Sequence, residues 1–138
     1  MSEQHKLLHT IICPVRWGDM DAIGHVNNTV YFRYFEQVRI NWLERIGAAD
    51  AVSAGETGIV IINAECTYLK PIIYPAKLEV SMSGGRPGRS SFVAYYEIRD
   101  AAERDTLFAT GSSKIVWVDR VNEKSIPLPA FIRSLLPG

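Results

Sequence analysis

The apolar residues of this 138-residue chain have helical spacing over residues 28–46 and a different arrangement elsewhere. Over residues 28–46 they recur every three or four positions, which is the spacing of one buried face of an α-helix. The apolar positions are Tyr31, Tyr34, Phe35, Val38, Trp42, Leu43 and Ile46. Polar residues take the other side, so we predict a long amphipathic helix; they are Arg33, Glu36, Gln37, Arg39 and Glu44. Asn27 or Asn28 is its expected N-cap, and Gly47 its expected C-terminal stop.

The other apolar segments favour β-strands, because they are rich in β-branched and aromatic residues and are bounded by turn residues. The predicted strands cover residues 7–17, 58–69, 78–82, 90–100 and 106–119, with a short terminal helix at 128–136. Turns are predicted between the strands, at 70–75, 84–89 and 101–105. Pro14 lacks the N–H that a strand ladder needs, which predicts an edge position or a bulge for the first strand.

The order of predicted elements is β-α-β-β-β-β, which indicates an α+β fold. A helix this apolar must be covered, and a long antiparallel sheet of about five strands curled around it would bury it economically. The late connections are short enough for an antiparallel meander. No repeat or linker interrupts the chain, so we expect a single domain over residues 1–138.

Charge and cysteine content exclude several classes of partner. Fifteen basic residues balance fifteen acidic ones, so no net field recruits nucleic acid or an anionic membrane. The first ten residues are too polar for a signal peptide, and no apolar run approaches the length of a membrane span. Cys13 and Cys66 are isolated thiols that we expect to be reduced. We therefore expect a cytoplasmic protein.

The loop before the helix concentrates groups that can act as acid, base or orienter. It contains Asp19, Asp21, His25, Asn27 and Asn28, with Gly18 and Gly24 freeing the backbone. A helix start offers unpaired N–H donors and the positive end of the helix dipole. Such a combination can activate water and stabilise an oxyanion, so we predict that this loop is the active site.

The stretch WGDMDAIG at residues 17–24 resembles the aromatic–Gly–Asp–x–Asp–x–x–Gly motif of the 4-hydroxybenzoyl-CoA thioesterase-like family, and the element order matches its hotdog fold. The resemblance implies an acyl-CoA thioesterase that releases a fatty or aromatic acid and CoA. The second aspartate of the motif, Asp21, would act as general base or nucleophile.

The following HVNN, with Tyr31 three residues on, is similar to long-chain acyl-CoA thioesterases and plant acyl-carrier-protein thioesterases. In the plant enzymes the aspartate, an asparagine and this histidine are implicated together. Asp21 and His25 match that pattern, whereas Ile23 stands where the plant motif has asparagine. The resemblance thus implies Asp21 and His25 as catalytic residues.

Asn27, Asn28 and Tyr31 are the expected substrate-binding residues, and each asparagine is also a natural cap or loop-fixing residue. The resemblance further implies a homodimer or homotetramer with sites at the subunit interface. We expect no cofactor, and no metal because the three histidines, His5, His9 and His25, lack zinc-site spacing.

Several alternatives are compatible with the sequence. Asp21 could only stabilise the turn, and Asp19 is expected to support the loop or to balance Arg16. The His25 ring either orients the substrate and shuttles protons, or fixes the loop by bonding a backbone carbonyl. The same fold also accommodates an acyl-thioester dehydratase or isomerase with His25 as base, and a non-catalytic acyl-CoA-binding module.

Overall fold

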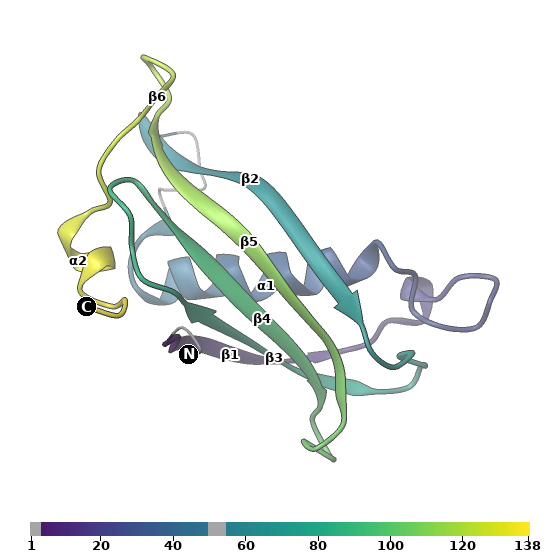
Figure 1. Cartoon of the computed structure of the whole chain (residues 1–138). Coiled ribbons are helices and arrows are strands. Elements are labelled where there is room, and N and C mark those ends of the chain that lie inside the picture. The colour runs from purple at the N-terminus through teal and green to yellow at the C-terminus, as the bar shows by residue number, and fades with distance from the viewer. Residues whose placement is uncertain (1–3, 50–54) are drawn as a thin grey trace.

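The computed structural model of the protein describes residues 4–49 and 55–138, and in it one long helix lies across a curved sheet (Figure 1). The strands are β1 (Lys6–Pro14), β2 (Thr57–Tyr68), β3 (Lys77–Gly84), β4 (Ser91–Asp100), β5 (Leu107–Asp119) and β6 (Lys124–Ser125). The helices are the 3-10 turn η1 (Trp17–Asp19), α1 (Val30–Arg45) and α2 (Ala130–Arg133). The predicted α+β class, with a central helix on an antiparallel sheet, is confirmed.

The strands are ordered β1-β3-β4-β5-β2, and each pairs with its neighbours in antiparallel fashion. The predicted meander is confirmed for β3, β4 and β5 but does not include β2, which pairs with β5 at the outer edge. The connection from β2 to β3 instead passes the start of α1. Ile72 in this connection is fully buried, and its carbonyl accepts the Val26 N–H at 2.8 Å. The buried Ile72 side chain and this hydrogen bond hold the connection beside the start of the helix.

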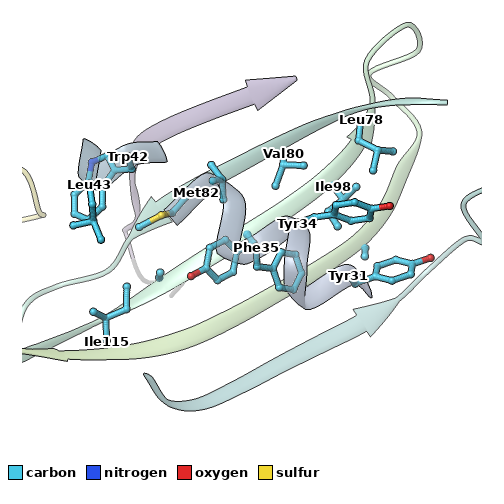
Figure 2. Close-up of a cluster of buried hydrophobic side chains, with 14 of the residues drawn as sticks. Tyr31, Tyr34, Phe35, Trp42, Leu43, Leu78, Val80, Met82, Ile98 and Ile115 are labelled. Atoms are coloured by element: carbon cyan, nitrogen blue, oxygen red, sulfur yellow. The ribbon is translucent and has the colours of Figure 1, made fainter. Parts of the chain in front are cut away.

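The predicted apolar face of the helix packs on the concave side of the sheet (Figure 2). Six of its seven named residues are buried, and Ile46 is half-buried. Alternate strand residues meet this face, as a period of two requires. They include Leu78, Val80, Met82, Phe92, Ala94, Tyr96, Ile98, Ala109, Ile115 and Trp117. The Phe35 ring stacks on Tyr96 with centroids 4.6 Å apart.

Gly111 on β5 faces the ring of Phe35 from α1. A Cβ at this position would sit 2.8 Å from the Glu65 carbonyl oxygen and closer still to the ring of Phe35. The glycine therefore makes room for the Phe35 ring against β5.

The first residue of the helix differs from the prediction, whereas its C-terminal stop is the predicted one. α1 begins at Val30 with Thr29 in the N-cap position, so the assignment of Asn27 or Asn28 as N-cap is wrong. The Asn27 side chain instead accepts the Thr29 N–H from outside the helix. At the other end Gly47 has a φ of +80° and follows the last helical turn. This positive φ confirms it as the stop.

Other element bounds differ by a few residues from those predicted. β1 ends at Pro14 rather than at residue 17, because the chain turns into η1 immediately afterwards. Pro14 does lie on an outer strand of the sheet, as its missing N–H predicted. The terminal helix covers only Ala130–Arg133, and the two-residue β6 was not predicted. In the described part of the chain, no helix is both long and apolar enough to cross a bilayer.

Candidate active site

The loop between β1 and α1 folds into a tight hairpin that projects beyond the helix at one end of the molecule (Figure 1). Met20 and Val26 form an antiparallel bridge at its base. The Asp21 N–H donates to the His25 carbonyl at 3.0 Å, and the Gly24 N–H donates to the Asp21 carbonyl at 3.1 Å. Gly24 has a φ of +95°, a conformation that costs glycine little. The hairpin brings residues 21 and 25 side by side.

The Asp21 carboxylate is half-buried and held at both oxygens. Its Oδ1 accepts the Ile23 N–H at 2.9 Å, and its Oδ2 accepts the Asn27 amide Nδ2 at 3.2 Å. A carboxylate oxygen can accept two hydrogen bonds, so each oxygen retains acceptor capacity. The group is thus oriented by the protein and still available to a substrate or a water molecule.

Asn27 joins this carboxylate to the start of the helix. Its Nδ2 donates to Asp21, while its Oδ1 accepts both the Thr29 N–H at 2.9 Å and the Thr29 hydroxyl at 2.6 Å. Both ends of the amide are therefore engaged by the protein. This geometry matches the loop-fixing role that the residue type allowed.

Asp19 anchors the loop to the buried face of α1. Its Oδ2 accepts the Tyr34 hydroxyl at 2.8 Å and the Arg16 N–H at 3.0 Å, and its main-chain carbonyl accepts the Asn27 N–H at 2.9 Å. Burial, together with the bond to Asp19, raises the pKa of Tyr34 far above its usual value. The predicted supporting role of Asp19 is confirmed, through the main chain of Arg16 rather than its guanidinium.

The start of α1 presents one unused main-chain donor. The Asn27 carbonyl accepts the Val30 N–H at 3.0 Å, which turns that carbonyl toward the helix. The N–H of the same trans peptide, which belongs to Asn28, points the opposite way. It makes no hydrogen bond within residues 4–49 and 55–138. A free N–H at the positive end of a helix is suited to an anionic oxygen.

A hollow of about 340 Å³ lies between this loop and the end of β2. Its wall consists of Asp21, Ile23, His25, Val26, Asn28, Tyr31, Tyr68, Leu69, Lys70 and Pro71. Four of the five predicted site residues therefore surround one space, and the fifth, Asn27, bonds to Asp21 from behind.

The His25 ring faces this hollow without a hydrogen-bond partner among the described residues. The loop is closed by the His25 main-chain carbonyl, which accepts the Asp21 N–H. The structure thus gives no role to the ring in fixing the loop. Its nitrogens remain available to a bound molecule.

The sequence did not identify the wall formed by Tyr68, Leu69, Lys70 and Pro71. These residues lie about forty positions after the loop, and only the passage of the β2–β3 connection past the helix start brings them there. The Tyr68 ring meets that of Tyr31 edge-on, with centroids 4.7 Å apart.

A second hollow of about 510 Å³ lies on the other side of the loop. It is lined by Trp17, Gly18, Met20, Asp21, Ala22, Gly24 and Tyr74. Trp17 and the nearby Ile23 are among the most exposed apolar side chains described, at 76% and 77%. Apolar surface therefore borders the carboxylate on both sides.

This arrangement suits attack on a carbonyl group. An oriented carboxylate and a free helix-start N–H can supply a base or nucleophile and an oxyanion donor. In the part of the chain that the structure describes, no group of three or more histidine, cysteine or acidic side chains is placed to hold a metal ion.

Comparison with known proteins gives consistent matches. Residues 15–136 match the family model of the thioesterase-like superfamily. The solved structure of the PA2801 protein, a candidate thioesterase from Pseudomonas aeruginosa, is 40% identical and has a TM-score of 0.89, covering 94% of this chain and 98% of its own.

Two further relatives match over most of their lengths. A candidate acyl-CoA thioesterase from Xanthomonas campestris is 31% identical with a TM-score of 0.74, over 83% of this chain and 95% of its own. The long-chain acyl-CoA thioesterase FadM of Escherichia coli is 25% identical over 126 residues, which are 88% of this chain and 92% of FadM. The part of the chain that matches the family model includes the loop and α1.

Proposed function

This chain belongs to the thioesterase-like superfamily and is a thioester hydrolase, and on that premise we propose that it hydrolyses an acyl-CoA with Asp21 as the reacting carboxylate. One observation supports this role above the others. The Asp21 carboxylate, oriented by Ile23 and Asn27, lines the same hollow as the Asn28 residue whose N–H is free. The acyl group, fatty or aromatic, would bind against the apolar surface beside this carboxylate.

The proposed chemistry follows from the thioester itself. Its carbonyl carbon is electrophilic and thiolate is a good leaving group, so few catalytic groups are needed. Asp21 either removes a proton from the attacking water or attacks the carbonyl carbon to form a mixed anhydride that water then cleaves. The Asn28 N–H would stabilise the oxyanion that develops in either route.

His25 and Lys70 are proposed to act on the same substrate. The unpartnered His25 ring can orient the thioester or return a proton to the departing thiolate. Lys70 adds a positive charge to the wall, which suits the phosphates of CoA. Asn28 and Tyr31 would bind the substrate as wall residues, while Asn27 would act from behind the carboxylate.

Substitution of Asp21 tests the proposal. We expect Asp21→Asn to lower kcat by at least about a hundredfold in an assay of thiol release from a panel of acyl-CoAs. Asp105→Asn, in an exposed turn far along the chain, is the matched control and should retain wild-type activity. Full activity of a folded Asp21→Asn protein would overturn the role of this residue.

Membership of this superfamily favours hydrolysis over the dehydratase, isomerase and binding-module alternatives. The same panel checks this choice, because a dehydratase would hydrate an enoyl-CoA without releasing thiol. A binding module would retain acyl-CoA without turnover. The preferred acyl group is the one with the highest kcat/KM in the panel.

We also propose that two chains pair along β2, as a homodimer or within a homotetramer. β2 is an outer strand, so its second row of N–H and C=O groups has no strand beside it among the described residues. Val60, Ile61 and Ile62 on this strand are exposed at 42%, 37% and 56%. Because the end of β2 forms a wall of the hollow, a partner on this edge would reach the site.

Light scattering coupled to gel filtration tests this pairing. We expect the mass of a dimer or tetramer for the wild-type protein, and a smaller mass for Ile62→Glu, which places a charge on the exposed strand. An active wild-type protein that remains monomeric at micromolar concentration would contradict the pairing.

A further inference from the structure

The last residue of β2 makes a direct bond to the start of the central helix. The Tyr68 hydroxyl donates to the Asn28 main-chain carbonyl at 2.8 Å, across forty residues of sequence. Its ring also meets Tyr31 edge-on and lines the hollow beside Asp21. Tyr68 thus contacts the helix start through two separate groups, a ring edge and a hydroxyl.

The hydroxyl holds one of the two peptide groups that flank Asn28. The peptide after Asn28 is bonded at both ends, because Tyr68 donates to its carbonyl and Asn27 Oδ1 accepts its N–H from Thr29. The peptide before Asn28 is held by the bond from Val30 to the Asn27 carbonyl. Because hydrogen bonds hold both peptide groups that flank Asn28, the orientation of its free N–H is fixed.

We propose that Tyr68 is a positioning residue of the hydrolytic reaction, whose hydroxyl keeps the Asn28 main chain oriented so that its N–H meets the developing oxyanion. This inference rests on the proposed function and extends it to a residue outside the loop. Tyr68 acts here through Asn28 and takes no part in proton transfer.

The donor state of this hydroxyl is secure over the working range of an enzyme. Desolvation by burial raises the pKa of Tyr68 above its usual value, so the phenol keeps its proton at neutral and mildly alkaline pH. The hydrogen bond from the Tyr68 hydroxyl to the Asn28 carbonyl is therefore retained at neutral and mildly alkaline pH.

A positioning role and a wall role predict different kinetic effects. An N–H that meets the oxyanion stabilises the transition state more than the bound substrate, so its misplacement lowers kcat rather than raising KM. A wall residue contributes to substrate binding through its ring. Tyr68→Phe keeps the ring and its contact with Tyr31 and removes only the hydroxyl.

We expect Tyr68→Phe to lower kcat roughly three- to tenfold, the usual range for one hydrogen bond, while KM stays within about twofold of wild type. Tyr68→Leu, which also removes the ring, should raise KM in addition. Thr67→Val is the matched control: it removes a hydroxyl from the adjacent residue of the same strand, which faces the opposite side of the sheet. It should leave both constants unchanged.

The outcomes separate this inference from the proposed function. If Asp21→Asn abolishes thiol release but Tyr68→Phe has wild-type kcat, the role of Tyr68 is refuted and that of Asp21 stands. If Asp21→Asn is fully active, the proposed function fails first. A fall in kcat for Tyr68→Phe matched by Thr67→Val would reveal a general effect on β2 and would also refute the role. Thermal melting of each variant confirms that it is folded.

Discussion

Alanine substitutions at Asn27 and Asn28 distinguish the roles of two adjacent asparagines that look equivalent in the sequence. The Asn27 amide bonds to Asp21 Oδ2, to the Thr29 N–H and to the Thr29 hydroxyl. The Asn28 side chain makes no hydrogen bond to the described residues, and its contacts come from the main chain. Asn27→Ala therefore removes three hydrogen bonds, and Asn28→Ala removes none.

The expected magnitudes follow from these bonds. A hydrogen bond to a charged group contributes about 1.5–3 kcal/mol and a neutral one about 0.5–1.5 kcal/mol. Because the loop is half-exposed, water replaces part of each. If the bond to Asp21 acts mainly in the transition state, its loss lowers kcat by roughly ten- to thirtyfold. The two bonds to Thr29 stabilise the fold, so the free energy of unfolding should fall by about 1–2 kcal/mol.

Thiol release under saturating substrate measures the first effect, and urea denaturation followed by tryptophan fluorescence measures the second. Asn28→Ala should affect kcat at least about threefold less than Asn27→Ala does, since its main-chain N–H and carbonyl remain. The coupling of Asp21 to the helix start would be refuted if both variants had the same kcat. A loss of stability in Asn27→Ala without any loss of kcat would also refute it.

Two further predictions concern stability. Gly111→Ala should lower the free energy of unfolding by about 1–3 kcal/mol because its Cβ meets the buried ring of Phe35 and the Glu65 main-chain carbonyl. Gly84→Ala should cost less because its closest contacts are the flexible side-chain ends of Leu136 and Leu8, and equal urea midpoints for the two variants would contradict this. The folded state raises the pKa of Tyr34, so the stability it confers is complete below the unfolded value near 10 and is lost above it. Between pH 8 and pH 11, Tyr34→Phe should lose about 1.4 kcal/mol less stability than wild type, and parallel losses would contradict the assignment.

The elements whose signal is local were predictable from the sequence. The spacing of Tyr31, Phe35, Val38 and Trp42 identified the buried face of α1, because a helix places every third or fourth residue on one side. The density of carboxylates and amides between Gly18 and the helix identified the loop. This signal is also local, because all of these groups lie close together in the sequence.

Features that depend on distant contacts were not predictable. Asn27 was a reasonable N-cap by type, and its side chain does accept the Thr29 N–H, but α1 begins only at Val30 and the Asn27 amide also bonds to Asp21. Tyr68 gave no sign of its role, because strand residues of this kind are common. Only the pairing of β2 with β5, and the crossover that follows, place it against the helix start.

The two outer strands of the sheet differ in a way that limits aggregation. β1 begins with the exposed Lys6 and ends in Pro14, which cannot donate to a further strand. Both features discourage another chain from adding there. β2 carries neither a proline nor a lysine. A molecule with one sheet edge open to strand pairing can bind one neighbour through it. The open edge of that neighbour is then occupied as well. Such units close as pairs, whereas growth into a fibre needs a second open edge on every molecule.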